Sequence, residues 1–241
     1  MSKKLNVTVW DEREGAIGPY PNGMYTTIAD FLKKSGEFGD VRIALQPQPE
    51  HGLTEEVLNT TDVLVYWAHC FHHEVQDDIV ERIRKRVLGG MGLILLHSAH
   101  ASKIFGRLVG YEPWNLRWRE VGELERVWRI DHGHPITAGV PEFFDIPHSE
   151  MYGEHFHIPT PDELLFISWY EGGEVFRSGC TFKCGLGKIF FFSPGHETFP
   201  IYEMPEVQRI ITNAVKWAAP NGNAAIATGQ MPFERPTPSV K

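Results

Sequence analysis

The sequence predicts an α/β fold of the doubly wound kind, in which helices cover both faces of a mainly parallel sheet. Short, nearly continuous apolar runs are typical of strands that are buried on both faces. Amphipathic helical stripes alternate with these runs, and a strand–helix–strand order implies parallel crossovers. The chain has 241 residues, which is long enough to bury a large core in one domain.

Six apolar runs are predicted to form the strands of this sheet. Cys180, Gly185 and Gly187 lie before the last run, which favours a hairpin at the edge of the sheet. The six runs are residues 5–10, 41–45, 63–67, 92–96, 164–169 and 188–192.

Three helices are predicted from apolar residues at steps of three and four. The first starts near Met24 and ends at Gly36, and the second runs from Val75 to Val87 before two glycines. The last lies between Pro205 and Pro220. These residues are the usual helix punctuation, since proline suits a first turn and glycine a C-terminal cap.

The middle and the end of the chain are less regular. Residues 111–127 are rich in Trp and Arg, and residues 132–161 are rich in Gly, Pro and His, so long loops with a few strands are expected there. The folded domain is expected to span residues 1–219. Residues 220–241 form a Pro-rich tail that is either disordered or in contact with a neighbouring subunit.

Composition excludes several classes of function. The net charge is −8 and no stripe of basic residues occurs, so a nucleic-acid partner is not expected. No apolar run approaches the roughly 20 residues of a membrane helix, and no signal peptide is evident, so a cytoplasmic protein is expected. The three cysteines do not form a disulfide framework. Twelve His and seven Trp suit metal or sugar binding without deciding between them.

Polar residues with acid–base or metal-binding chemistry follow several of the predicted strands. Ligands of open parallel sheets bind beyond the carboxyl ends of the strands, so these residues are expected to meet there. They are Asp11 and Glu12 after the first strand, His69 after the third, His97, Ser98 and His100 after the fourth, and His196 after the last.

Ser98 has the position of a nucleophile between a strand and a helix, but its neighbours argue against that role. A nucleophile elbow needs small residues two places on either side, and Leu96 and His100 occupy those places. Ser98 is therefore expected to cap the helix or to bind substrate.

Imidazoles at several strand ends predict a divalent metal, with zinc the first choice and manganese the second.

Five short motifs stand out along the chain. They are Trp10-Asp11-Glu12, Tyr66-Trp67-Ala68-His69, Leu95-Leu96-His97-Ser98-Ala99-His100, Ser149-Glu150-Met151-Tyr152 and Pro194-Gly195-His196-Glu197. Together they resemble the motifs of the ThuA family of trehalose-utilisation proteins. The resemblance covers about residues 5–219 and implies the class I glutamine amidotransferase-like fold, a flavodoxin-like three-layer α/β/α sandwich.

The resemblance does not extend to glutamine hydrolysis. Amidotransferases use a cysteine in a Gly-x-Cys-x-Gly elbow with a His-x-Glu pair. Here Ser98 takes the place of the cysteine, both glycines are missing, and Glu197 follows His196 directly. A shared fold is not a shared activity.

The resemblance implies a role in trehalose breakdown beside a sugar dehydrogenase that makes a 3-keto sugar. The expected reaction is hydrolytic or eliminative cleavage of a 3-keto-glycoside, which needs a base, an enolate stabiliser and an acid. The expected base is His100 or His196. Either a metal or His69 together with Ser98 is expected to stabilise the enolate. Glu150 is expected to act as the acid or as a metal ligand.

The expected site is a single cleft with its ligands at the carboxyl edge of the sheet. The residues expected to line the cleft are His69, His97, Ser98, His100, Glu150 and His196. The expected metal ligands are His69, His97, His100 and His196. The residues expected to contact the sugar are Trp10, Asp11, Glu12, His69, Trp114 and Tyr152. No nucleotide cofactor or membrane contact is expected, and a homo-oligomer is expected. The alternatives are a non-catalytic sugar-binding or regulatory protein and a hydrolase that acts through Ser98.

Overall fold

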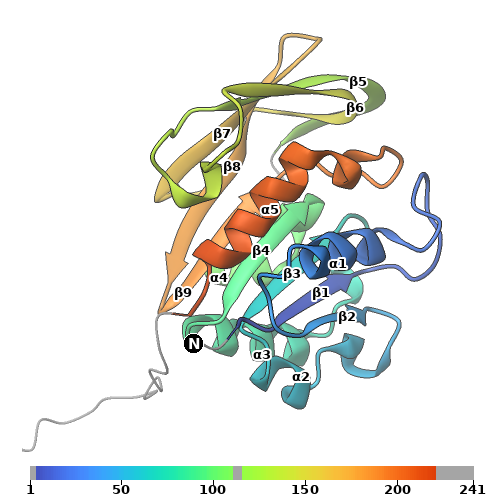
Figure 1. Ribbon diagram of the computed structural model, residues 1–241, viewed down its shortest axis with the longest axis vertical. Coiled ribbons are helices and arrows are strands. Elements are labelled where there is room, and N and C mark those ends of the chain that lie inside the picture. Colours follow the sequence, from blue (N-terminus) through green and yellow to red (C-terminus); the bar gives the residue numbers. More distant parts are fainter. Residues whose placement is uncertain (1–3, 111–115, 221–241) are drawn as a thin grey trace, which may run out of the picture.

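The computed structural model describes residues 4–110 and 116–220. These residues form a nine-stranded sheet with helices on both faces (Figure 1), which confirms the predicted α/β class. The strand order is β2-β1-β3-β4-β9-β8-β7-β5-β6. The strands are β1 (Val7–Asp11), β2 (Val41–Leu45), β3 (Val63–Ala68), β4 (Gly92–His97), β5 (Arg117–Arg129), β6 (Phe143–Gly153), β7 (Glu163–Tyr170), β8 (Val175–Cys184) and β9 (Gly187–Phe192).

The sheet is parallel on one side and antiparallel on the other. Strands β2, β1, β3, β4 and β9 pair in parallel. Strands β9, β8, β7, β5 and β6 pair antiparallel. The sheet is therefore less parallel than the sequence predicts, because the middle of the chain adds long antiparallel strands.

Helices α1 (Met24–Lys34) and α5 (Pro205–Trp217) pack on one face of the sheet. Helices α2 (Glu55–Asn59), α3 (Asp77–Leu88) and α4 (Lys103–Val109) pack on the other. Successive residues of a strand point to opposite faces, so each parallel strand contributes to both cores. The helices bury the predicted stripes: Ile79, Ile83 and Val87 of α3 are fully buried, and each such side chain stabilises the fold by about 1.5–3 kcal/mol.

The predicted hairpin is formed by β8 and β9, with Cys184 paired to Gly187. It does not lie at the edge of the sheet, because β9 also pairs with β4. Phe190, Phe191 and Phe192 are all fully buried, and a strand that buries successive residues must be covered on both faces. The two edge strands are β2 and β6.

Strands β5 and β6 replace most of the predicted loops in the middle of the chain. Strand β5 has 13 residues, most of them exposed or half-buried. Its stability comes from cross-strand pairs, such as that between Arg126 and Asp145, whose Nε and Oδ1 atoms are 2.6 Å apart. Its charged and aromatic residues are not arranged as an apolar run, which is why the sequence does not predict it.

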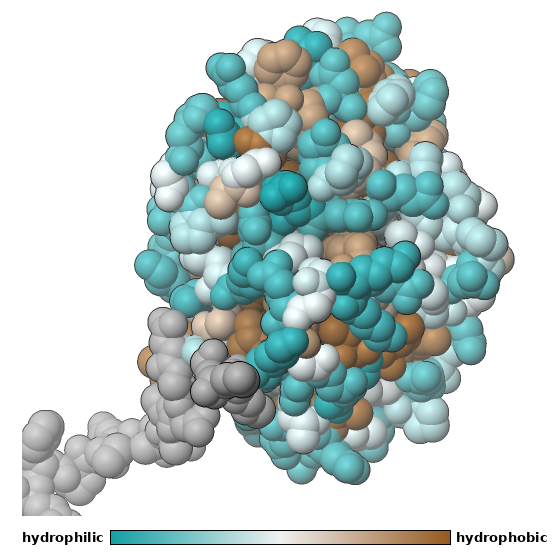
Figure 2. Space-filling model, viewed as in Figure 1, coloured by the Kyte–Doolittle hydropathy of each residue, from teal (hydrophilic) through white to brown (hydrophobic). Residues whose placement is uncertain are grey.

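The surface seen in Figure 2 is mostly hydrophilic, with hydrophobic areas between the polar residues. Among residues 4–110 and 116–220, no helix is long and apolar enough to cross a membrane. The predictions for residues 221–241 concern a segment outside the described residues.

Candidate active site

Three histidines converge because β3, β4 and β9 are neighbours in the sheet. His69 follows β3, His97 is the last residue of β4, and His196 follows β9. The ring centres are 4.9 Å apart for His69 and His97, 4.9 Å for His69 and His196, and 5.2 Å for His97 and His196. The carboxyl ends of adjacent parallel strands thus bring the three imidazoles together, as the sequence predicts.

Glu150 completes this group from the antiparallel side of the sheet. It lies on β6, and its Oε2 atom is 3.4 Å from Nε2 of His97 and 4.0 Å from Nε2 of His196. One ligand atom from each of His69, His97, Glu150 and His196 lies within 4.8 Å of the others. These four residues are called the imidazole–carboxylate cluster below.

His97 occupies the strained turn between strand and helix, the position at which a nucleophile elbow holds its nucleophile. Its backbone has φ 56° and ψ −127°, a conformation that costs a non-glycine residue about 1–3 kcal/mol. Ser98 begins the short 3₁₀ helix that follows. Ser98 therefore lies one residue beyond the elbow, and its match to the position of the amidotransferase cysteine is wrong, since the elbow presents an imidazole to the site in place of a hydroxyl.

Each histidine of the cluster is oriented through its Nδ1 atom. The carboxylate of Glu197 and the carbonyl of Ser193 can only accept, so the rings of His69 and His97 carry their proton on Nδ1 and leave Nε2 as a lone pair. Nδ1 of His69 lies 2.9 Å from Glu197 Oε1, and Nδ1 of His97 lies 3.3 Å from the Ser193 carbonyl oxygen. His196 differs, because its Nδ1 accepts a hydrogen bond from the backbone N–H of Thr198 at 3.2 Å and lies 2.8 Å from Thr198 Oγ1. The neutral ring of His196 therefore carries its proton on Nε2, which an ion bound there would displace.

Burial dominates the electrostatics of the cluster. It lowers the pKa of His97 well below the usual value and also lowers the pKa of His196, so both rings are neutral at neutral pH. Burial raises the pKa of Glu150 to about 7. Burial also opposes the charge on His69, but the hydrogen bond and negative charge of Glu197 outweigh it and raise the pKa of His69.

A cavity of about 520 Å³ opens above the cluster. Four of the six residues predicted for the cleft line it, namely His69, Ser98, His100 and Glu150. The other two, His97 and His196, are buried and reach the cavity through their contacts with Glu150. The remaining lining residues are Cys70, His72, Ala101, Leu116, Trp118, Glu120 and Tyr152.

The hydroxyl of Ser98 is hydrogen-bonded to the hydroxyl of Tyr152 across the cavity wall. Burial raises the pKa of Tyr152 well above its usual value, so the phenol keeps its proton. His100 packs edge-on against Tyr152 and Phe156, and burial lowers its pKa to about 3. His100 is therefore a neutral ring and a weak base, and it lies outside the imidazole–carboxylate cluster.

The predicted sugar contacts of the first strand have structural partners. Trp10 is fully buried and stacks on Tyr66, with ring centres 4.1 Å apart, so it does not face a ligand. Asp11 accepts a hydrogen bond from the backbone of Arg13 at 2.9 Å. Glu12 accepts bonds from the backbones of Cys70 and Phe71 at 2.7 and 3.0 Å. Trp114 lies outside the described residues.

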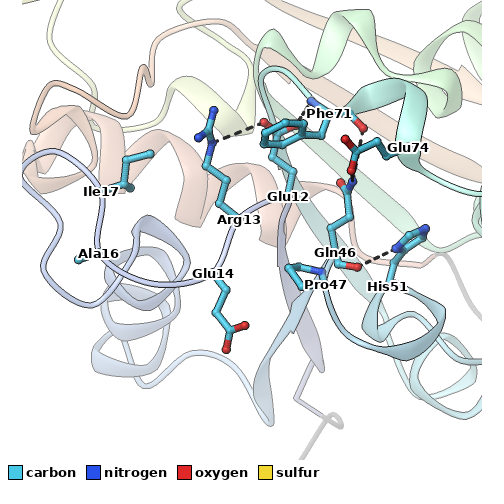
Figure 3. A pocket seen from close by; sticks show the side chains of 10 residues that line it. All are labelled: Glu12, Arg13, Glu14, Ala16, Ile17, Gln46, Pro47, His51, Phe71 and Glu74. Carbon is cyan, nitrogen blue, oxygen red and sulfur yellow. Dashed lines mark hydrogen bonds and ion pairs between the residues drawn. The ribbon is translucent and has the colours of Figure 1, made fainter.

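A second cavity of about 470 Å³ lies beside the ends of β1 and β2 (Figure 3). Glu12, Arg13, Gln46 and Glu74 are among its lining residues. Arg13 also contacts Glu197, the partner of His69, with 3.4 Å between Nη2 and Oε1. Arg13, in the wall of this cavity, therefore helps to position Glu197 and, through it, His69 of the cluster.

Trp118 and Glu120 are cavity residues that sequence reasoning did not single out. They are two residues apart on β5 and both line the cavity, as expected for one face of a strand. Glu120 Oε1 is 3.4 Å from Nε2 of His196. The richness of this segment in Trp and Arg was the available signal, but without strand register it could not show which residues face the site.

Comparisons with known proteins agree with this architecture. The family model ThuA, described as trehalose utilisation, matches residues 6–218. No match was found among curated proteins.

Solved structures of similar fold include the following three. The chain has 16% identity and a TM-score of 0.68 to a ThuA-like protein from Parabacteroides merdae, covering 98% of this chain and 95% of that one. A cytoplasmic protein from Salmonella typhimurium has 15% identity and a TM-score of 0.60, covering 90% of this chain and 100% of that one. A ThuA-like protein from Bacteroides uniformis has 15% identity and a TM-score of 0.59, covering 90% of this chain and 92% of that one. At these identities the likeness shows the fold alone.

Proposed function

Because the chain belongs to the ThuA family of trehalose-utilisation proteins, we propose that it is an enzyme that cleaves a trehalose-type disaccharide carrying a ketone at C3. One observation supports this most directly. A carboxylate, Glu120, and a phenol, Tyr152, line one cavity above the imidazole–carboxylate cluster. Cleavage next to a carbonyl requires a base and a proton donor that face the same cavity.

The ketone makes the hydrogen at C2 acidic. A base removes this hydrogen, and the electron pair of the resulting enolate expels the oxygen at C1. The departing oxygen takes a proton, and addition of water across the new C1–C2 double bond gives net hydrolysis. Atoms and electrons balance without an oxidant or a reductant.

We assign the base to Glu120 and the proton donor to Tyr152. Glu120 is half-exposed at the cavity wall, whereas the pKa of about 3 makes His100 a weak base for this step. Tyr152 keeps its proton because burial disfavours the phenolate, and Ser98 orients its hydroxyl. Trp118, with 65% of its surface exposed beside these groups, offers an aromatic face to a sugar ring.

The proposed reaction needs a supply of keto sugar. A sugar dehydrogenase that oxidises C3 of the disaccharide is the class of enzyme that would provide it. We place the reaction in the cytoplasm, consistent with the description of the similar Salmonella protein.

The test is to incubate the purified protein with trehalose and with 3-ketotrehalose and to follow the released monosaccharides. Turnover is expected with the keto sugar only. Glu120→Gln should lower kcat by about 10²–10⁴ if Glu120 is the base. Glu142→Gln is the matched control, since this exposed glutamate precedes β6 and does not line the cavity.

Two results would contradict the proposal. Binding of the keto sugar by calorimetry without any turnover would favour the alternative of a sugar-binding or regulatory protein. Equal kcat values for Glu120→Gln and the wild type would remove Glu120 from the base role.

A further inference from the structure

We propose that His69, His97, Glu150 and His196 bind one divalent transition-metal ion, and that zinc suits this set best. Binding of this ion does not depend on the identity of the substrate. One contact in the cluster is unfavourable without a cation. Nε2 of His97 and Oε2 of Glu150 face each other at 3.4 Å, and the Nδ1 proton of His97 leaves Nε2 as a lone pair.

The atoms that meet at the cluster are buried and unsatisfied. Among the described residues, Nε2 of His97, Nε2 of His196 and Oε2 of Glu150 have no hydrogen-bond partner. One such group costs about 1–3 kcal/mol, so three of them within one cluster indicate a missing partner. A proton shared between His97 and Glu150 does not replace it, because 3.4 Å is too long for an O–H···N hydrogen bond.

The spacing fits a metal ion. Ligands about 2.0–2.1 Å from a tetrahedral zinc ion lie roughly 3.4 Å from one another. The distances from Glu150 to His97 and His196 are 3.4 and 4.0 Å, and no pair in the cluster exceeds 4.8 Å. Small rotations of these side chains would bring the set to bonding distance.

The residues around the four ligands hold the histidine rings in the way that is usual at metal sites. Metal-binding histidines usually donate their other ring N–H to a carboxylate or a carbonyl, which fixes the ring. His69 donates to Glu197 and His97 to the Ser193 carbonyl. Glu197 is in turn contacted by Arg13, so the support extends to the wall of the second cavity (Figure 3).

The ligand types select the class of metal. Imidazole nitrogens favour zinc and other transition metals, whereas magnesium and calcium prefer oxygen ligands. His69 and Glu150 line the large cavity and give an ion a path from solvent. Of the ligands expected from the sequence, His100 is replaced by Glu150, because the nearest partner of His100 Nδ1 is the carbonyl of His97 at 3.5 Å.

The experiment measures zinc binding directly. Protein stripped with a chelator is titrated with Zn²⁺ by calorimetry, and bound zinc is counted by mass spectrometry. One zinc per chain is expected for the wild type, with no binding of Ca²⁺ at the same concentration. Glu150→Gln should weaken Zn²⁺ binding by about 100-fold or more, and Glu197→Ala, which leaves all four ligands in place, by about 10–100-fold.

His100→Phe is the matched control, because it changes a histidine of the same cavity outside the cluster and should leave zinc affinity unchanged. Circular dichroism of every variant shows whether it folds. If Glu150→Gln does not fold, Glu197→Ala and His69→Ala carry the test. The proposal is overturned if the wild type binds no Zn²⁺, or if folded cluster variants bind it as tightly as His100→Phe.

Discussion

The Ser98 hydroxyl is bonded to Tyr152, and this pairing leads to a prediction about catalysis. Ser98→Ala removes one hydrogen bond, so turnover of a keto-glycoside should fall by at most about tenfold, or 0.5–1.5 kcal/mol. Tyr152→Phe removes the proposed proton donor itself and should cost about 10²–10⁴ in kcat. Steady-state kinetics of the two variants measure the difference. Abolished turnover in Ser98→Ala, with a covalent adduct trapped on the wild type, would instead establish a serine mechanism.

Asp11 predicts a dependence of stability on pH. Its side chain is buried, and burial raises its pKa from 3.8 to about 7. The folded protein therefore binds this proton more tightly than the unfolded chain does. The resulting stability is fully present below pH about 4 and is lost as the pH rises to about 7, a change of about 4 kcal/mol.

Asp11→Asn keeps an oxygen for the backbone of Arg13 and removes the titration. Urea unfolding of chelator-treated protein across this pH range should show a smaller loss of stability in Asp11→Asn than in the wild type. Asp30→Asn, at an exposed position on α1, is the control and should keep the slope of the wild type. Parallel curves for the wild type and Asp11→Asn would show that Asp11 does not titrate in this way.

At the scale of elements, strands buried on both faces are the ones that a sequence can predict. The segment 41–45 is predicted to the residue, because its apolar run ends where the chain leaves the sheet. Strands β5 and β6 carry charged and aromatic residues on exposed faces, and their register depends on partners far along the chain. This also explains why Trp118 and Glu120 could not be assigned to the site, whereas the histidines at the strand ends could.

The contact between α3 and β9 gives a prediction for Gly187. A Cβ atom at this position would collide with the backbone carbonyl oxygen of Val87, which cannot move without disturbing the end of α3. Gly187→Ala should therefore lower the free energy of unfolding by about 1–3 kcal/mol. Gly133→Ala is the control, because the nearest atom there is 3.7 Å away and the change should stay within about 0.5 kcal/mol. Urea midpoints compare the two, and equal midpoints would show that β9 can shift away from α3.

At the scale of the whole molecule, the site joins the two sides of the sheet. The parallel side supplies His69, His97 and His196, which follow the rule that ligands gather beyond strand ends. Glu150 comes from β6, at the far edge of the sheet order. No local pattern places it there, and only the resemblance to the ThuA family indicated it. Which side chains meet across such a sheet depends on its curvature, which sequence periodicity does not specify.

This arrangement predicts that zinc holds β5 and β6 against the parallel side. An ion bound by three ligands from strand ends and one from β6 restrains β6, and at 100 times its Kd it stabilises the folded protein by about 2.7 kcal/mol. Hydrogen exchange should therefore slow most in β5 and β6 on adding Zn²⁺, with little change in the solvent-accessible helix α2, which contributes no ligand. Glu150→Gln should lose this protection, since its remaining ligands all belong to the parallel side. Protection confined to the ends of β3, β4 and β9 in the wild type would mean that Glu150 does not bind the ion. Side-chain contacts between the two sides of the sheet would then be those of Tyr152 with Ser98 and of Glu120 with His196.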